Sequence, residues 1–203
     1  MRSNILLALA LVSSICLIAC AQGKTSKEQN KMKEKGKVLV VYFSRTGGNY
    51  GVGNITKGNT EIVAEMIAKE TGADLFQIKP EKAYPDDYDE CTEVAKRELN
   101  SNARPAIKGD VKAEDYDTIF IGYPIWWDDM PMPVYTFIEK HDWQGKTVMP
   151  FSTHEGSALG STESRLRSAC KGAKVEKGLA VYGHTAQNDR QEAQKKVTAW
   201  LEK

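Results

Sequence analysis

Residues 37–47 of this 203-residue chain read KVLVVYFSRTG, and this stretch decides the fold class. Its first part, VLVVYF at 38–43, is an uninterrupted run of β-branched, aliphatic and aromatic side chains. Such a run is typical of a strand that is covered on both faces, as in a parallel sheet. The polar residues SRTG then end the run. We therefore expect a buried first strand followed by a polar loop.

The remainder of the chain alternates between helical and extended patterns. At 59–71, for example, apolar residues such as Ile62 and Met66 recur at helical spacing, and Gly72 can end the helix. The pattern predicts helices at 59–71, 88–100, 134–141, 162–169 and 188–201, and further strands at 73–79, 118–122, 147–151 and 176–182. Such alternation indicates an α/β fold with a doubly wound, five-stranded parallel sheet. Ligands of such sheets bind beyond the carboxyl ends of the strands, where the strand order reverses.

The amino-terminal segment has the features of an export signal. Arg2 is followed by an apolar run at 5–19, which is shorter than the ~20 residues that a membrane-spanning helix needs. The run ends in LIAC at 17–20, which resembles a bacterial lipobox. The lipobox resemblance implies that Cys20 becomes the lipidated amino terminus, although an uncleaved anchor or an ordinary cleaved signal peptide are alternatives.

These observations divide the chain into three parts. Residues 1–19 are expected to be a lipoprotein signal peptide, residues 20–36 a flexible, solvated tether, and residues 37–203 the folded domain. We therefore expect an exported lipoprotein that is anchored to a membrane on its periplasmic or cell-surface side. The sequence leaves the membrane leaflet open.

Charge and cysteine content limit the classes of partner and site. The chain carries 28 basic and 27 acidic side chains, and setting aside Arg2 and the charges from Lys24 to Lys37 leaves 21 basic and 25 acidic. This mildly acidic domain has no basic face for nucleic acid, which is therefore not an expected partner. Cys91 and Cys170 fit neither a CxxC pair nor a zinc spacing, so they are two free thiols or one disulfide, and no metal site is expected.

The loop after the first strand has the composition of a phosphate-binding loop. Ser44, Thr46 and Gly47 precede an insertion at 48–58, and the expected helix begins at Asn59 and Thr60, so that the rejoined pieces read S-R-T-G-N-T. Hydroxyls, backbone N–H groups and the positive end of a helix dipole together suit one phosphate. The alternative is an ordinary polar turn between a strand and a helix.

Two later loops have the composition of a site for a planar ring. The loop at 122–133 reads GYPIWWDDMPMP, and Trp126 and Trp127 are expected to form a stacking wall, the alternative being a hydrophobic lid on the core. The loop at 152–161 reads STHEGSALGS, and its small, hydrogen-bonding residues suit the polar edge of a heterocycle.

With its YFSRTG…NT, GYPIWW and PFSTHEGS motifs, the chain resembles the flavodoxin-like family over residues 37–203. The resemblance implies a strand order of 2-1-3-4-5 and one bound FMN at the switch between strands one and three, both carried over from flavodoxin itself. It implies phosphate ligands in the first loop, residues flanking the isoalloxazine ring in the second, and residues facing the other ring edge in the third. The implied cofactor-binding residues are Ser44, Thr46, Gly47, Asn59, Thr60, Pro124, Ile125, Trp126, Trp127, Thr153, His154, Gly156 and Ser157.

The resemblance further implies an electron-transfer protein whose flavin does the chemistry. Its partners are then redox proteins or small quinone-like acceptors. No catalytic residue is assigned, although His154 could donate to the flavin's carbonyl edge or assist hydride transfer, or could simply bond to a neighbouring backbone group. Asp128 and Asp129 are expected to disfavour an anionic reduced flavin.

Several other readings of the sequence stay open. An FMN-dependent NAD(P)H:quinone or azo-type reductase is the nearest alternative, and a flavin-free adaptor that kept the fold is a different one. A hydrolase using Ser152 or Ser157 with His154 is disfavoured, because the sequence lacks a G-x-S-x-G elbow. The insertion at 48–58 could be a flap beside the cofactor, a docking surface or a tolerated insertion.

Overall fold

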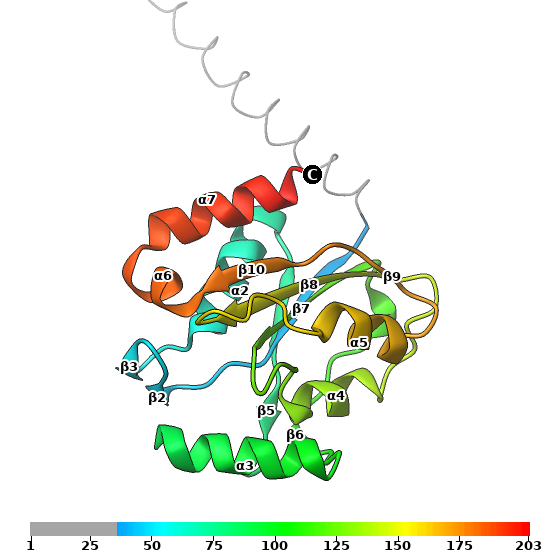
Figure 1. Ribbon diagram of the computed structural model, residues 1–203. Coiled ribbons are helices and arrows are strands. Elements are labelled where there is room, and N and C mark those ends of the chain that lie inside the picture. The colour runs from blue at the N-terminus through cyan, green and yellow to red at the C-terminus, as the bar shows by residue number, and fades with distance from the viewer. Residues whose placement is uncertain (1–35) are drawn as a thin grey trace, which may run out of the picture. The chain divides into compact units, whose positions relative to one another are not determined.

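A parallel sheet of six strands lies at the centre of the computed structural model, which describes residues 36–203 (Figure 1). The strands are ordered β10-β8-β7-β1-β4, and the short strand β9 also pairs with β8. Their bounds are β1 Val38–Tyr42, β4 Asp74–Gln77, β7 Thr118–Pro124, β8 Thr147–His154, β9 Lys174–Val175 and β10 Leu179–Tyr182. Counted from β4 to β10, the five main strands follow the order 2-1-3-4-5, which confirms the predicted topology.

The sixth strand is β9, which lies just before the predicted last strand at 176–182; of that predicted range only 179–182 form β10. Both strands pair with β8. Between them, the N–H of Gly178 donates to the Glu163 carboxylate at 2.7 Å rather than to a strand. The five-strand prediction was therefore wrong by one short strand.

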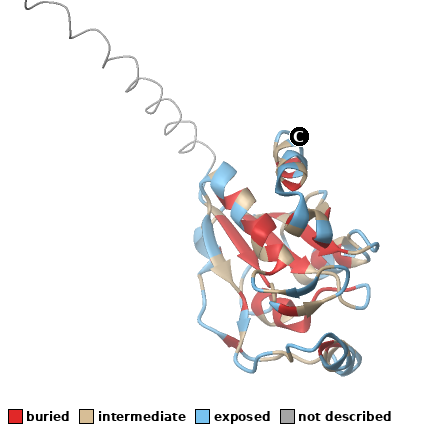
Figure 2. Cartoon of the chain, turned by 90° about the vertical axis from the view of Figure 1, so that its left-hand side faces the viewer, coloured by how far each residue is buried: buried red, intermediate tan, exposed pale blue. Residues whose placement is uncertain are grey.

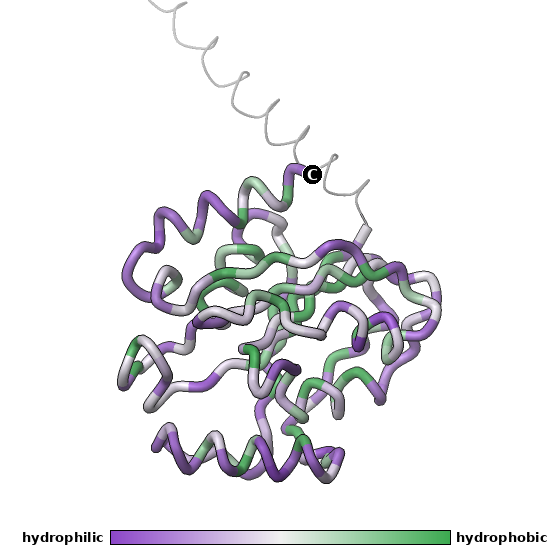
Figure 3. Tube along the Cα trace, viewed as in Figure 1, coloured by the Kyte–Doolittle hydropathy of each residue, from purple (hydrophilic) through white to green (hydrophobic). Residues whose placement is uncertain are grey.

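Helices cover both faces of this sheet, as a doubly wound fold requires. On one face lie α2 (Asn59–Thr71), α6 (Gly183–Asn188) and α7 (Arg190–Leu201), and on the other lie α4 (Met132–Ile138) and α5 (Thr162–Ala169) (Figure 1). Helix α3 (Tyr88–Asn100) lies beyond α4. Buried residues concentrate in the strands and on the inner helix faces (Figure 2), and the tube is most hydrophobic along the central strands (Figure 3).

Strand β1 shows why its sequence is apolar throughout. Leu39 and Val41 belong to the hydrophobic core on one side of the sheet, whereas Val40 and Tyr42 belong to the core on the other side. Because successive side chains of a strand point to opposite faces, a strand with two covered faces needs apolar residues at every position. The prediction of a strand covered on both faces is confirmed.

The helix predictions hold for α2, α3 and α5, whereas two other helices differ. Helix α4 begins at Met132, before the predicted position, because Pro133 fits the first turn of a helix, whose N–H groups need no intrahelical partner. The predicted last helix at 188–201 begins instead at Arg190, because the Asp189 side chain accepts a hydrogen bond from the Glu192 N–H at 3.0 Å and so caps α7. The preceding short helix α6 was not predicted.

Strands β7 and β8 extend further than predicted, and this extension bears on the site. Pro124 ends β7 and pairs with Thr153, and His154 ends β8. These three residues are therefore held by the sheet rather than by loops. In contrast, the predicted strand at 73–79 is shorter, because Lys79–Pro80 (β5) leaves the main sheet and pairs with Ile107–Lys108 (β6).

The insertion at 48–58 contributes to a small hairpin. Gly47–Asn49 (β2) and Gly53–Ile55 (β3) pair antiparallel, and Gly51 lies in the tip with φ +76°, a conformation that favours glycine. A short 3₁₀ turn, Ala113–Asp115 (η1), precedes β7.

Residues 37–203 form one compact unit. Within the described range, no helix combines the length and apolarity needed to cross a bilayer. The predictions for the signal peptide, Cys20 and the tether up to residue 35 lie outside the residues that the structure describes.

Candidate cofactor pocket

A cavity of about 450 Å³ opens at the carboxyl ends of β7 and β8, beside the loop that follows β1. This is the position at which a doubly wound sheet binds its ligands. The lining residues come from strand ends, from the hairpin and from α3, and are Arg45, Asn49, Tyr50, Asn59, Tyr88, Cys91, Thr92, Ala95, Pro124, Ile125, Trp126, Trp127, Thr153, His154, Glu155 and Ser157. Eight of these residues were predicted from the sequence: Asn59, Pro124, Ile125, Trp126, Trp127, Thr153, His154 and Ser157.

The ends of β7 and β8 form the rigid side of the cavity. The N–H of Ile125 donates to the Thr153 carbonyl at 3.0 Å, which extends the sheet pairing past the end of β7. The buried Thr153 hydroxyl shares a hydrogen bond of 2.7 Å with the Thr60 hydroxyl at the start of α2. The predicted residue Thr60 therefore supports the cavity floor and does not itself line the cavity.

Trp126 and Trp127 are neighbours with different environments. Trp126 packs edge-on against Phe43 and Tyr84, with ring centroids 5.3 and 5.1 Å away. Trp127 is 49% exposed, its indole N–H donates to the Thr92 carbonyl at 3.0 Å, and the Lys96 ammonium lies 4.7 Å from its ring centroid. A side chain this exposed does not cover the hydrophobic core, so the alternative prediction of a hydrophobic lid is wrong for Trp127.

His154 is positioned to act as a hydrogen-bond donor in the cavity. It is only 8% exposed, and its Nδ1 accepts a hydrogen bond from the Gly156 N–H at 3.0 Å. An accepting Nδ1 assigns the proton of the neutral ring to Nε2. Burial lowers the pKa of His154, which favours this neutral form. The His154 ring also contacts Tyr182, with centroids 4.4 Å apart.

Glu155 connects the cavity to α6 and to the hairpin. Its carboxylate accepts the backbone N–H of His184 at 2.7 Å and pairs with His184 Nδ1 at 2.6 Å. Gly51 at the hairpin tip lies so close to this side chain that a Cβ there would be 2.9 Å from the Glu155 carboxyl carbon. The carboxylate is thus held between three segments of the chain.

Residues of the predicted phosphate loop contact neighbouring parts of the chain. The Ser44 hydroxyl accepts the Glu61 N–H at 3.1 Å and so satisfies the start of α2, while Gly47 packs against Asp86. Thr46 is exposed. Of this group, Asn59 lines the cavity, and its side-chain oxygen accepts from Gln187 at 2.8 Å. With Ser44, Thr46, Gly47 and Thr60 outside the lining, their role towards a phosphate stays a prediction.

Gly156 is likewise outside the lining, and its part is to orient His154. The other half of the lining was not predicted: Arg45, Asn49, Tyr50, Tyr88, Cys91, Thr92, Ala95 and Glu155. Four of these residues lie on one face of α3, as the i, i+3, i+4 and i+7 spacing of Tyr88, Cys91, Thr92 and Ala95 shows. This spacing is the feature of the sequence from which a shared helix face could have been predicted. That spacing does not say that the helix lies over the pocket.

The structure decides between two alternatives for the cysteines. Cys91 and Cys170 are both buried and both free. Burial raises the pKa of the Cys170 thiol to about 12 and also raises that of Cys91, so neither is a reactive thiolate at neutral pH. Within residues 36–203, no cluster of three or more His, Cys, Asp or Glu side chains is arranged to hold a metal ion.

Asp129 and Ser152 are engaged in contacts that do not fit the roles considered for them from the sequence. Asp129 is buried and paired with Arg165 at 3.2 Å, so it is not a free negative charge beside the cavity, and Asp128 lies outside the lining. The Ser152 hydroxyl donates to the Ala158 carbonyl at 2.8 Å. Among the described side chains, therefore, the Ser152–His154 pair of a hydrolase does not form.

Fold and pocket together define a doubly wound parallel α/β protein with a ligand site at its topological switch point. Comparison with known proteins then identifies the family. The chain belongs to the flavodoxin family, because a family model described as Flavodoxin matches residues 37–203. This confirms the predicted resemblance and supports FMN as the cofactor. Among curated proteins, none matches the chain.

Solved structures give the same assignment. A proposed flavoprotein from Bacteroides eggerthii is 34% identical, over 82% of this chain and 96% of its own, with a TM-score of 0.65. One from Bacteroides uniformis is 31% identical, over 83% and 99%, also with a TM-score of 0.65. A flavoprotein from Lactobacillus acidophilus, solved in complex with FMN, is 22% identical over 75% and 97%, with a TM-score of 0.56, and shares the fold.

Proposed function

We propose that this chain binds one FMN in the pocket and acts as an electron-transfer protein that is exported and anchored to a membrane by lipid on Cys20. The observation that carries the proposal is the cavity itself. It has a volume of about 450 Å³, stands at the switch point, and joins aromatic side chains with a few polar groups. Sites for planar cofactors have this composition.

The residues present fit a flavin. Trp126, Trp127, Tyr50 and Tyr88 offer aromatic faces to a planar ring, and the His154 Nε2–H offers a donor to a ring acceptor. When bound, FMN supplies the one- and two-electron chemistry that side chains lack. The chain's own residues bind the ring, exclude water from one side of it and hold the His154 proton on Nε2.

The mouth of the pocket is compatible with electron transfer to another molecule. Tyr50, Tyr88 and Trp127 line the cavity and are also among the exposed large side chains, with Tyr50 66% exposed. A ring bound beside them would be close to the molecular surface. Redox proteins or small quinone-like acceptors are the proposed partners.

A reductase is a second candidate, favoured by one observation. A further hollow of about 640 Å³ lies beside the pocket and shares Asn49, Tyr50 and Tyr88 with it. Such a hollow offers room for a second small molecule, which a carrier protein does not need. The two candidates differ in whether NAD(P)H is oxidised.

The experiment that tests the proposal is a titration of purified apoprotein with FMN, followed by flavin fluorescence and the visible spectrum. We expect saturation at one FMN per chain with quenched fluorescence. Adding NAD(P)H and then a quinone to the loaded protein separates the candidates, because only the reductase turns over. If the protein leaves the fluorescence and the visible spectrum of FMN unchanged at every concentration, the proposal is contradicted and a flavin-free adaptor is favoured.

Lipid anchoring requires a separate test in the bacterial host. The full chain and its Cys20→Ala variant would be compared for incorporation of a labelled fatty acid and for partition into the membrane fraction. We expect label and membrane association in the full chain alone. Equal behaviour of the two would refute the anchor at Cys20.

A further inference from the structure

The segment Trp126–Asp129, which we name the tryptophan turn, has an unfavourable backbone. Trp126 and Asp129 pair through two backbone hydrogen bonds of 2.9 and 3.0 Å, which leaves Trp127 and Asp128 as the two central residues. Both have positive φ, at 52° and 61°. Turns of this kind usually place Asn and Gly at these positions, and a bulky side chain there is strained. Such a conformation persists only where the surroundings hold it.

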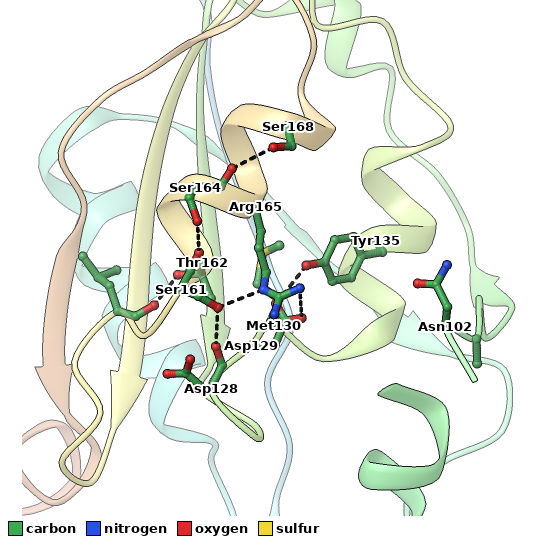
Figure 4. A network of polar contacts seen from close by, with 12 residues as sticks. Asn102, Asp128, Asp129, Met130, Tyr135, Ser161, Thr162, Ser164, Arg165 and Ser168 are labelled. Atoms are coloured by element: carbon green, nitrogen blue, oxygen red, sulfur yellow. Dashed lines mark hydrogen bonds and ion pairs between the residues drawn. The ribbon is translucent and has the colours of Figure 1, made fainter. Parts of the chain in front are cut away.

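The first support of the tryptophan turn is the buried carboxylate of Asp129. Its Oδ1 accepts the Met130 N–H at 2.7 Å and the Tyr135 hydroxyl at 2.8 Å. Its Oδ2 pairs with Arg165 Nη1 at 3.2 Å, while the Asp129 side chain is only 2% exposed. Figure 4 shows Arg165 reaching from α5 towards this carboxylate. A buried carboxylate requires such partners.

The second support comes from Ser161, at the end of the β8–α5 loop (residues 155–161). Its hydroxyl donates to the Asp128 carbonyl at 2.9 Å, and its backbone N–H points to the same oxygen at 3.3 Å (Figure 4). Arg165 Nε in turn donates to the Ser161 hydroxyl at 2.8 Å. Gly160 is also in close contact, because a Cβ there would lie 2.9 Å from the Asp128 carbonyl oxygen.

Arg165 therefore bonds both to the tryptophan turn and to the β8–α5 loop, and it reinforces the direct bond that Ser161 makes between them. Its planar guanidinium offers several donors in fixed directions, which suits bridging two acceptors. The tryptophan turn supplies Trp126 and Trp127 to the pocket, and the β8–α5 loop supplies Glu155 and Ser157. Arg165 itself does not line the pocket.

We propose that Arg165 is a positioning residue that locks the tryptophan turn to the β8–α5 loop and so sets the spacing of the two loops that would enclose the flavin. This inference rests on the proposed function for its effect on FMN. The contacts of Arg165 with Asp129 and Ser161 are present without FMN. Replacing Arg165 should release the strained turn, because the strain remains and one of its supports is lost.

The test compares Arg165→Gln with Arg165→Lys and with the control Arg167→Gln. Arg167 lies on the same helix, and among residues 36–203 its ion-pair partner is Glu163 of that helix, at 4.0 Å. Amide hydrogen exchange in the apoprotein should become faster at residues 126–130 in Arg165→Gln and stay unchanged in Arg167→Gln. Arg165→Lys keeps the charge but has no Nε–H for Ser161, so its exchange should be intermediate.

The second readout is FMN affinity. We expect the dissociation constant of Arg165→Gln to rise about tenfold and that of Arg167→Gln to change less than about twofold. Unchanged local exchange, exchange that rises uniformly over the whole domain, or equal effects of the two glutamine variants would each overturn the inference. If the wild-type protein binds no FMN, the proposed function fails, whereas the exchange comparison still decides the role of Arg165.

Discussion

The pocket has two walls that the fold supports in different ways. The strand wall consists of Pro124, Thr153 and His154, at the ends of β7 and β8, where sheet pairing holds the backbone. The helix wall consists of Tyr50 from the hairpin and Tyr88 and Thr92 from α3, and both of its tyrosines are exposed. One sheet edge thus carries a wall that strand pairing fixes and a second wall that side chains of a hairpin and a helix form.

A few contacts attach the helix wall to the rest of the molecule. The Arg45 guanidinium donates to three carbonyls, those of Gly48 at 2.6 Å, Pro85 at 2.7 Å and Asp86 at 3.0 Å. The Gly48 N–H donates to the Asp86 carbonyl at 2.7 Å, and the rings of Tyr50 and Tyr88 lie 6.1 Å apart. These contacts fasten the helix wall at its amino-terminal end, near the hairpin, and the Trp127 indole attaches it further along α3, at the Thr92 carbonyl.

The largest effect is expected at the base of the strand wall. Trp126→Ala removes two edge-on aromatic contacts and leaves a void beside Phe43 and Tyr84. The free energy of unfolding should fall by about 3 kcal/mol, and FMN binding should weaken. Urea denaturation and FMN titration measure the two effects.

Trp127→Ala serves as the matched control, because Trp127 is half exposed. Its loss should cost no more than about 1 kcal/mol of stability. If both substitutions lower the free energy of unfolding equally, Trp126 does not support the fold more than Trp127 does.

A smaller effect is expected where the helix wall is attached. Arg45→Met keeps much of the side-chain volume and removes the three hydrogen bonds to the hairpin and to residues 85–86. Stability should fall by about 1–2 kcal/mol, because each bond contributes modestly. Limited proteolysis should cut first in the hairpin, at 47–55. If cleavage begins elsewhere and at the wild-type rate, Arg45 does not fasten this wall.

The exposed tyrosines should affect access rather than stability. Tyr50→Ala removes a ring that is 66% exposed, so the free energy of unfolding should change by less than about 0.5 kcal/mol. FMN should nevertheless dissociate faster, by about threefold, because one side of the pocket loses its cover. Stopped-flow measurement of FMN release tests this, and an unchanged rate would show that Tyr50 does not cover the pocket.

The smallest effect is a dependence of stability on pH. Burial lowers the pKa of His154, with Glu155 acting to raise it and His184 to lower it. The unfolded chain therefore binds more protons than the folded chain just below the ordinary histidine pKa of about 6.5. Stability should fall as the pH drops through this region towards the folded pKa. His154→Gln should lose part of this slope, and an identical slope in both proteins would contradict the assignment.

The sequence was sufficient to predict the residues of the strand wall and the order of the main strands, although it placed those residues in loops. Apolar runs such as 38–43 identify buried strands, and the ring-facing motifs sit at the strand ends. The helix wall could not be predicted, because the placement of α3 depends on long-range contacts. The pair of Asp129 with Arg165 joins residues 36 positions apart, and a pattern of neighbouring residues does not show such a contact.

A crystal structure of the protein grown with FMN shows whether the cofactor binds in this pocket. We expect one FMN in the cavity at the ends of β7 and β8, in contact with residues of both walls and with Trp126. FMN bound elsewhere on the surface, or a cavity that stays empty at saturating FMN, would contradict this expectation.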